Sequence, residues 1–319
     1  MVDLAAHNVS KTMNQVNESH RFKIGTFDCT VVSDGTFTYT PPTFPPPTTF
    51  LFANAQKEDL AQALHAHNLD PEKWTEWISP YLCLVIDTGE NIVLVDTGAD
   101  GLGPSTGKLL QNLQSNGISP GDIDTVILTH GHPDHIGGNT TSEGGSAFPD
   151  ARFVMWKDEW DFWNSEEAEL KLEHGKEVLL GFARCNLPPI RDQVDLVEHE
   201  TEIVPGVSAV AAPGHTLGHM ALAVSSGGEN LLCVSDAFLH PIQVEQPEWY
   251  SIVDFSPERV VDTRRRLLGM AAREKALIFA FHFAFPGLGF ATWSGKGWRW
   301  QPVDSSKTGA HASTLIRAN

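Results

Sequence analysis

Short apolar runs alternate with amphipathic stretches along most of this chain. Apolar runs bounded by Gly, Asp or Asn favour buried strands, and apolar positions at helical spacing favour helices with one buried face. The predicted strands are 22–26, 29–33, 81–86, 92–95, 123–128, 152–155, 207–211, 220–224, 231–234 and 276–281, and the predicted helices are 57–67, 106–117, 157–163, 166–182 and 258–275. Some neighbouring strands meet at hairpins while others are separated by helices. We therefore predict an α/β fold (α+β in some schemes), an αββα sandwich of two mixed β-sheets flanked by helices.

Three segments fall outside this alternation. Residues 1–20 are polar and predict a flexible lead, residues 21–303 form a single domain, and residues 304–319 form a C-terminal tail. Inside the domain, residues 40–56 are rich in proline and phenylalanine, which predicts an extended arm. Three roles are open for its aromatic side chains: they pack on the chain's own core, they cover a site, or they contact a second copy of the chain in a homodimer.

The densest group of candidate ligands directly follows an apolar run that ends at Leu128. It holds His130, His132, Asp134 and His135 within six positions. Residues two apart in an extended chain point the same way, so His130 and His132 can reach one ion. If the chain then turns into a helix, Asp134 and His135 face elsewhere. The motif therefore predicts a site for two divalent metal ions.

Three later candidates each follow a strand-like run, at the point from which a side chain can enter a site at the edge of stacked sheets. They are His215, Asp236 and His282. His215 would complete the first site, His282 would complete the second, and Asp236 would bridge the two cations and balance their charge.

Two further residues are candidates for supporting roles. His219 lies four positions after His215 and is either a ligand in its place or, as we favour, a group that orients His215 or its loop. Asp96 also ends an apolar strand and either forms a turn or supports the histidine loop from behind.

Composition narrows the class of protein. Apolar residues make up 41% and charged residues 19% of the chain, which is ordinary for a globular protein. Forty acidic against 22 basic residues give a net charge of −18, which argues against nucleic acid or an anionic membrane as partner. No signal segment or long apolar span is present, so we predict a cytoplasmic protein. The widely spaced cysteines, Cys29, Cys83, Cys185 and Cys233, predict reduced core residues.

The ligand motif and the later candidates, together with Val95-Asp96-Thr97-Gly98 and Gly214-His215-Thr216, resemble the metallo-β-lactamase fold hydrolase superfamily over about residues 21–303. The resemblance implies the sandwich fold and a dinuclear site. Shorter segments, among them Asp161-Phe162-Trp163 and the stretch 282–289, look like the methyl parathion hydrolase branch, which also contains lactonase-like enzymes. By this resemblance Trp163 and Phe283 line the substrate pocket, with packing beneath a helix as the alternative for Trp163.

The chain also departs from its relatives at two places. Metallo-β-lactamases proper often use a cysteine in the second site, whereas Cys233 lies three residues before Asp236, which makes β-lactam hydrolysis the weaker alternative. Homoserine lactonases of this fold usually place a tyrosine shortly after the bridging aspartate; here Phe238, Leu239 and His240 follow it. His240 is the candidate replacement as a donor to an oxyanion in the pocket.

These observations predict a hydrolase that acts on a small ester-like molecule. Two bound ions lower the pKa of a bridging water to roughly 7, and the hydroxide attacks a lactone, ester or phosphotriester. Asp134 is the candidate proton relay and Asp236 the shared ligand. Zinc is the expected metal, with manganese, cobalt or iron as other options. An iron-dependent oxidoreductase on the same scaffold, or a metal-stabilised binding protein that uses residues 44–52, is the alternative.

Overall fold

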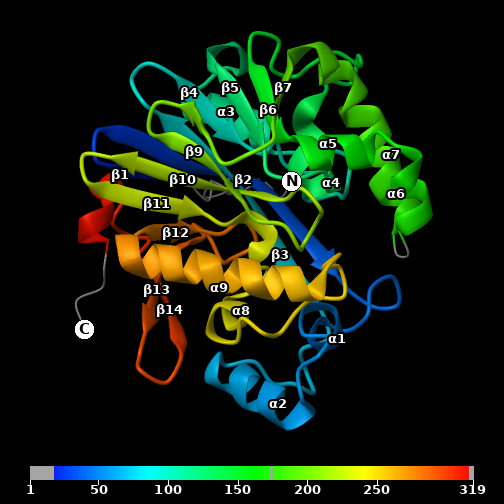
Figure 1. Cartoon of the computed structure of the whole chain (residues 1–319), viewed down its shortest axis with the longest axis vertical. Helices are drawn as coiled ribbons and strands as arrows, with labels where there is room; N and C mark the ends of the chain where they lie inside the picture. The colour runs from blue at the N-terminus through cyan, green and yellow to red at the C-terminus, as the bar shows by residue number, and fades with distance from the viewer. Residues whose placement is uncertain (1–17, 173–174, 316–319) are drawn as a thin grey trace, which may run out of the picture.

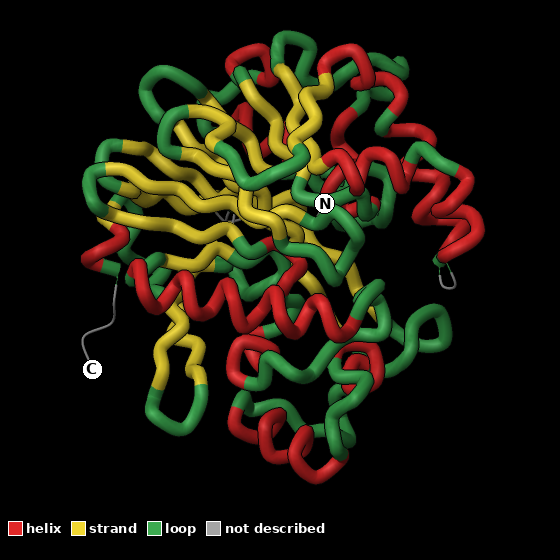
Figure 2. Tube along the Cα trace, in the orientation of Figure 1, coloured by secondary structure: helices red, strands yellow, loops and turns green. Residues whose placement is uncertain are grey.

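The computed structural model describes residues 18–172 and 175–315. Two mixed β-sheets stack face to face with helices on their outer faces, so the predicted αββα sandwich is confirmed (Figures 1 and 2). The lead predicted for residues 1–20 lies outside the described residues as far as residue 17. Ser19 and His20 already belong to the first strand.

The described residues form a sheet of eight strands and a sheet of seven. The first has the order β15-β1-β2-β3-β4-β5-β6-β7, with β1 (Ser19–Ile24), β2 (Phe27–Tyr39), β3 (Trp77–Asp87), β4 (Ile92–Val95), β5 (Thr125–Leu128), β6 (Arg152–Trp156), β7 (Val194–Val197) and β15 (Ala310–His311). The second has the order β14-β13-β12-β11-β10-β9-β8, with β8 (Glu202–Val204), β9 (Val207–Ala211), β10 (Met220–Ser226), β11 (Glu229–Cys233), β12 (Leu277–Phe279), β13 (Leu288–Trp293) and β14 (Trp298–Pro302).

Helices cover both outer faces. The helices of the described residues are α1 (Pro47–Leu51), α2 (Lys57–Ala66), α3 (Leu109–Ser115), α4 (Pro133–Ile136), α5 (Lys157–Trp163), α6 (Glu166–Lys171), α7 (Lys176–Asn186), α8 (Pro241–Glu245) and α9 (Pro257–Glu274). Figure 1 shows α9 crossing the second sheet and α5 to α7 beside the first. The predicted helix 166–182 is in fact two helices, and Gly175, in the left-handed region at φ 63°, starts the second.

The main apolar core lies between the sheets. Along β3, Leu84 and Ile86 face this inter-sheet core, whereas Cys83 and Val85 face the layer under the helices of the first sheet. This alternation explains why β3 reads as a continuous apolar run, because both of its faces are covered. Cys29, Cys83 and Cys233 are buried as predicted, but Cys185 is exposed on α7, so its assignment to the core was wrong.

The strand predicted over residues 29–33 does not end at Asp34-Gly35, where the chain forms a β-bulge within one long strand. β2 continues to Tyr39, and its pairing with β3 shifts register between Ser33 and Gly35. Gly35 takes up the bulge at φ 117°. The carboxylate of Asp34 is buried and accepts hydrogen bonds from the amides of Ala99, Gly107 and Leu109. The polar residue thus anchors the loop before α3 instead of ending the strand.

The arm predicted at residues 40–56 is packed into the molecule. Pro47 begins the short helix α1, and Phe50, Leu51 and Phe52 are buried. They belong to a fourth apolar cluster, here called the arm cluster, which also contains Leu60, Leu64, Trp77, Leu239 and Ile242. The aromatic side chains on which the homodimer prediction rested therefore contact the chain's own core.

The predicted C-terminal tail contributes to the first sheet. β15 pairs in parallel with β1. The carboxylate of Glu229, the first residue of β11 and next to the β10–β11 turn, accepts hydrogen bonds from the amide and hydroxyl of Ser313 and from the amide of Gly25. One side chain thus connects the C-terminal segment to the β1–β2 turn and to the β10–β11 turn.

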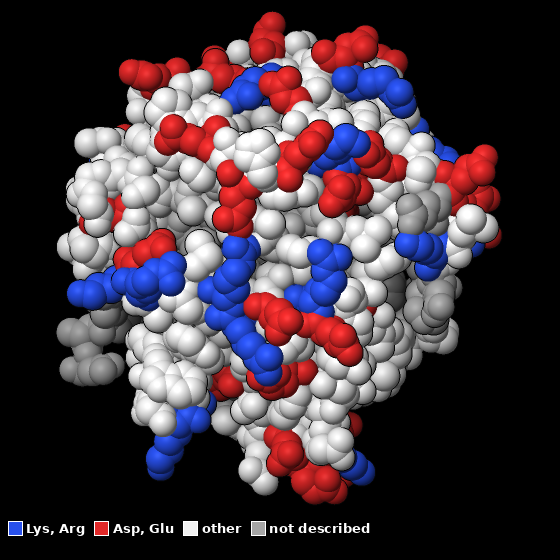
Figure 3. Space-filling view, viewed as in Figure 1, with Lys and Arg blue, Asp and Glu red and all other residues white. Residues whose placement is uncertain are grey.

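Charges of both signs mix on the surface. On the face in Figure 3, basic side chains gather along α9 among acidic ones, and Arg265 and Arg266 pair with Glu248 and Glu200. Among the described residues, no helix is long and apolar enough to cross a membrane.

Candidate metal centre

All the predicted ligands follow the carboxyl ends of strands. β4 and β5 run parallel, as do β11 and β12, and β9 shares the direction of β11 because both are antiparallel to β10. Their ends therefore meet at one edge of the sandwich. His130 and His132 follow β5, Asp134 and His135 lie on α4, and the other ligands follow β9, β11 and β12.

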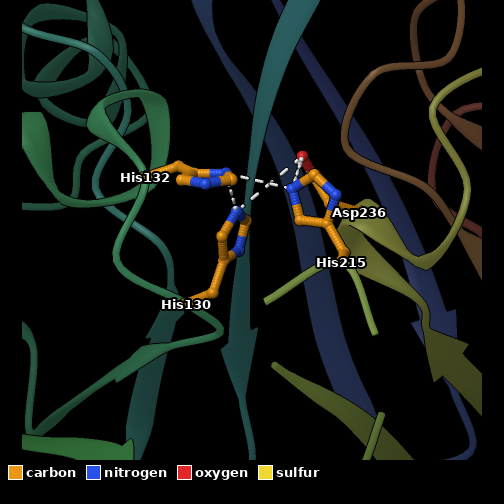
Figure 4. Close-up of side chains that lie close together, drawn as sticks. All are labelled: His130, His132, His215 and Asp236. Atoms are coloured by element: carbon orange, nitrogen blue, oxygen red, sulfur yellow. Dashed lines mark hydrogen bonds and ion pairs between the residues drawn. The ribbon is translucent and has the colours of Figure 1, made fainter. Parts of the chain in front are cut away.

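The first group consists of His130, His132, His215 and Asp236, whose candidate ligand atoms all lie within 4.8 Å of one another. The Nδ1 atom of His132 is 3.0 Å from Nε2 of His130 and 3.0 Å from Nε2 of His215. Figure 4 shows the imidazoles of His130 and His132 facing His215 and Asp236 across a small space. Three imidazole nitrogens and a carboxylate at this spacing form the donor set of a tetrahedral zinc site.

The second group consists of Asp134, His135, Asp236 and His282, also within 4.8 Å. Nε2 of His282 lies 3.4 Å from Asp134 Oδ2 and 3.0 Å from Asp236 Oδ2. The same Oδ2 atom of Asp236 is 3.4 Å from Nε2 of His215 in the first group. Asp236 is therefore shared, which is the place expected of a carboxylate that bridges two cations.

The residues fit a pair of divalent metal ions. Among the described residues, His135 Nε2 and Asp236 Oδ1 have no hydrogen-bond partner, although both are buried and they lie 3.2 Å apart. Buried polar atoms are rarely left without a partner in a native fold. A cation between them would satisfy both, and the nitrogen and carboxylate donors of both groups suit divalent transition metals.

The outward-facing ring nitrogens of four of these histidines are held in place. Nδ1 of His130 contacts Thr129 Oγ1 at 3.2 Å, and Nδ1 of His135 contacts Asp96 Oδ2 at 2.8 Å. On the second sheet, Nδ1 of His215 contacts Asp254 Oδ1 at 2.9 Å, and Nδ1 of His282 contacts Ser79 Oγ at 2.8 Å. Such partners fix the ring orientation of a metal-binding histidine and leave Nε2 for the ion.

The pKa values of the candidate histidine ligands shift in two directions. Burial, reinforced by neighbouring imidazoles, holds the pKa values of His130 and His132 well below the usual range, so both rings stay neutral with an electron pair to donate. Burial also opposes charge on His135, but the carboxylates of Asp236 and Asp134 outweigh it and raise its pKa. For Asp236, burial is outweighed by His282 and His135, which hold its pKa well below the usual range.

The two supporting candidates lie directly behind the ligands. Asp96 accepts hydrogen bonds from the amide and hydroxyl of Thr129 as well as contacting His135, so it holds both ends of the histidine motif. His219 accepts a hydrogen bond from the amide of Asp236 through Nε2 and contacts the carbonyl of Ala212 through Nδ1. Burial, followed by repulsion from His215, lowers the pKa of His219 to about 3. Among the described residues, the hydrogen bonds of the His219 ring therefore reach the backbone of Asp236 and of Ala212, just before the loop that carries His215.

The three predicted pocket residues lie in different places. The Trp163 ring is 5.8 Å from that of His132, beside the first group, and its indole N–H donates to Glu159. His240 packs against Phe52 in the arm cluster and accepts the amide N–H of Ile242, and burial lowers its pKa to about 3.

The structure places Phe283 in an apolar cluster and not in the substrate pocket to which the sequence assigned it. It is buried with its ring 4.9 Å from that of Trp300, in the apolar layer beneath α9, because the turn after β12 sends Phe283 to that layer and His282 to the ligands.

Sequence reasoning missed the residues that hold the ligands from a distance. Glu159, Asp254 and Ser79 each bind a ligand loop or a ligand ring, but none stands next to a ligand in the sequence. The only signal was local: Asp254 lies between Val253 and Phe255, and Glu159 directly precedes Trp160. Nothing in that pattern identifies their partners.

The sequence pattern that defines the metallo-beta-lactamase superfamily matches residues 78–282, more than half of the chain. The chain belongs to this superfamily, as its motifs predicted. An N-acyl homoserine lactonase of Bacillus thuringiensis is 28% identical over 226 residues, which cover 64% of this chain and 81% of that protein. The metallo-beta-lactamase domain-containing protein 1 of Xenopus laevis is 29% identical over 184 residues, 57% of this chain and 64% of its own.

Two solved structures have a similar fold over most of this chain. AidC, a dizinc quorum-quenching lactonase in complex with a product, has a TM-score of 0.80 at 25% identity and covers 90% of this chain and 99% of its own. The hydrolase AbOPH of the beta-lactamase superfamily has a TM-score of 0.80 at 26% identity and covers 91% and 99%. Family, fold and candidate ligands together support a metal-dependent hydrolase.

Proposed function

We propose that this protein is a dinuclear zinc hydrolase that opens small lactone rings. The observation that carries the proposal is the pair of four-residue groups that share Asp236. The lactonase relatives favour a lactone over an aryl ester or a phosphotriester, and the dizinc centre of AidC favours zinc. The cytoplasmic location stays a prediction from the sequence.

The two groups provide complementary functions for ester cleavage. A pair of divalent ions supplies a water of lowered pKa and polarises the ester carbonyl. His130, His132 and His215 would hold one ion, Asp134, His135 and His282 would hold the other, and Asp236 would contribute to both. Water adds to the carbonyl carbon, the ring C–O bond breaks, and a hydroxy acid is formed.

Asp134 is the residue we assign to proton transfer. It is 7% exposed, whereas Asp236 is 3% exposed and shared by both groups. Asp134 therefore has the better access to a substrate, and it can deliver the proton of the attacking water to the leaving alkoxide oxygen.

Aromatic side chains adjoin both groups and favour a lactone with an apolar substituent. Trp163 lies beside His132, and the rings of Trp77 and Tyr81 lie 5.7 Å and 5.5 Å from that of His282. Ligand sites are typically lined by such residues around a few placed polar groups. His240 has its Nδ1 engaged by an amide, which leaves the proton of the neutral ring on Nε2 as the donor we assign to the carbonyl oxygen.

The test compares metal content and turnover in the same preparations. Zinc-reconstituted protein is assayed against an N-acyl homoserine lactone, an aryl ester, a phosphotriester and a β-lactam. We expect two ions per chain and the highest kcat/KM on the lactone. His130→Ala should bind fewer ions and lose at least about 100-fold in kcat/KM.

The matched control is His65→Ala, since His65 is an exposed histidine on α2. It should match the wild type in both measurements. Full metal content and turnover in His130→Ala would refute the proposal. Iron in protein purified without added metal, with no hydrolysis in the panel, would favour the oxidoreductase instead.

A further inference from the structure

A single buried carboxylate joins the two loops that carry the imidazoles of the first group. Glu159, on the first turn of α5, has no exposed surface. Its Oε1 accepts the amide N–H of Gly131 at 2.9 Å and the indole N–H of Trp163 at 2.7 Å. Its Oε2 accepts the amide N–H of Gly218 at 2.9 Å. Three donors thus meet one carboxylate.

The two glycines stand among the ligands themselves. Gly131 separates His130 from His132, and Gly218 lies between His215 and His219. The two loops come from different sheets, after β5 and after β9. Glu159 therefore accepts one hydrogen bond from the loop that carries His130 and His132 and one from the loop that carries His215.

The packing around Glu159 leaves no room for a side chain at either glycine. A Cβ on Gly131 would lie 2.2 Å from the Trp163 indole nitrogen, and a Cβ on Gly218 would lie 2.4 Å from the amide nitrogen of Glu159. Both distances are far below van der Waals contact, so the loops approach α5 as closely as a backbone can.

We propose that Glu159 is a positioning residue that sets the distance between the two loops and thereby the geometry of the first metal site. The inference rests on the proposed dinuclear centre. A carboxylate can accept from donors on both sides at once, which an amide cannot do, because its NH₂ group would face an N–H. The second site takes its ligands from α4, η4 (Ser235–Ala237) and the turn after β12, to which Glu159 makes no hydrogen bond among the described residues.

The inference predicts a selective effect on one of two ions. Each site can be measured alone, in a His282→Ala background for the first and a His132→Ala background for the second. Binding of Co²⁺ is followed by its visible absorption, which reports ligand geometry. Adding Glu159→Gln should weaken binding about 10- to 100-fold in the His282→Ala background, with altered band intensities. In the His132→Ala background the affinity should change less than about threefold.

Two variants serve as controls on the same helix. Asp158→Asn makes the same chemical change at an exposed neighbour and should leave both affinities unchanged. Trp163→Phe removes one donor but keeps both glycine contacts, so it should affect the first site less than Glu159→Gln. If Glu159→Gln fails to fold, Glu159→Asp, which keeps the charge but is too short to span both loops, is measured in the same two backgrounds.

The outcomes separate this inference from the proposed function. Equal losses at both sites, or no loss at the first, would make Glu159 a general structural residue and overturn the inference. Wild-type protein that binds two Co²⁺ ions but hydrolyses no lactone would refute the proposed substrate, while a selective loss in Glu159→Gln would still support the positioning role. A chain that binds no ion in either background would refute both.

Discussion

Single residues behind the ligands decide how well the first group is ordered. Asp254 accepts from His215 through Oδ1 and from the amide of Ser251 through Oδ2, which also faces Arg264 at 3.3 Å. Both Asp254 and Arg264 have fully buried side chains. Burial opposes charge on Asp254, but Arg264 and His215 outweigh it and lower its pKa, so the carboxylate stays ionised.

Replacing Asp254 should therefore affect both stability and metal binding. Asp254→Asn leaves Arg264 buried without its counter-charge, which should cost about 3–5 kcal/mol in the free energy of unfolding. It should also weaken the first metal site about 10- to 100-fold. Urea unfolding of the metal-free protein and metal titration measure the two effects. Asp262→Asn, an exposed change on α9, the helix that carries Arg264, is the control and should do neither.

The grouping of the candidate ligands could be predicted from the sequence, whereas the residues that support them could not. His130 and its neighbours occupy six adjacent positions, so their grouping follows from chain geometry alone. Glu159 binds amides 28 and 59 residues away, and Asp254 binds a ring 39 residues away. Such contacts exist only once the sheets have stacked. The direction of the Phe283 side chain could not be predicted either, because it packs beneath α9 while the adjacent His282 points to the second group.

At the level of elements, the proline-rich composition of residues 40–56 predicted an extended arm, but part of this segment forms the helix α1. Pro47 fixes the φ of a first helical position as readily as that of an extended chain, so a proline-rich segment can start a helix. The apolar residues that follow are anchored by α2 and α8 through Leu64 and Ile242. The sequence predicted that the arm was aromatic but not what would cover it.

Phe52 is the residue that tests this packing. It is 2% exposed in the arm cluster. Phe52→Ala should lower the free energy of unfolding by about 3–5 kcal/mol without changing the association state. Denaturant unfolding and sedimentation velocity provide the two measurements. A wild-type dimer that this change converts to a stable monomer would show instead that the arm belongs to an interface.

The C-terminal element depends on one carboxylate. Hydrogen bonds from Ser313 and Gly25 outweigh partial burial and lower the pKa of Glu229 to about 2 from its ordinary 4.5. A depressed pKa means that the ionised form stabilises the fold. The stabilisation is complete above about pH 4.5 and is lost as the pH falls toward 2.

Glu229→Gln should therefore lower the unfolding midpoint of metal-free protein at pH 7, and the difference from wild type should shrink as the pH falls from 4.5 to 2. Thermal unfolding across this range is the measurement. Glu202→Gln, in the edge strand β8, is a control of the same charge. A constant difference between Glu229→Gln and wild type at every pH would contradict the assignment to ionisation.

For the whole molecule, the two groups connect the sheets at one edge. Their ligands extend from His130 to His282 and come from loops of both sheets. Ions bound there would stabilise the sandwich against separation of its halves. Removal of metal with a chelator should lower the unfolding free energy by about 4 kcal/mol for each site that was filled at 1,000 times its Kd. Calorimetry with and without added zinc measures the change, and identical midpoints would contradict it.

The position of Asp236 has a consequence for how the protein fills with metal. Oδ2 of this one carboxylate lies 3.4 Å from His215 and 3.0 Å from His282. A first ion held by Asp236 would order a carboxylate that the second ion also needs, so the second would bind to a partly ordered site. Protein given half an equivalent of zinc per site should then divide into empty and doubly filled chains, with few singly loaded ones between them.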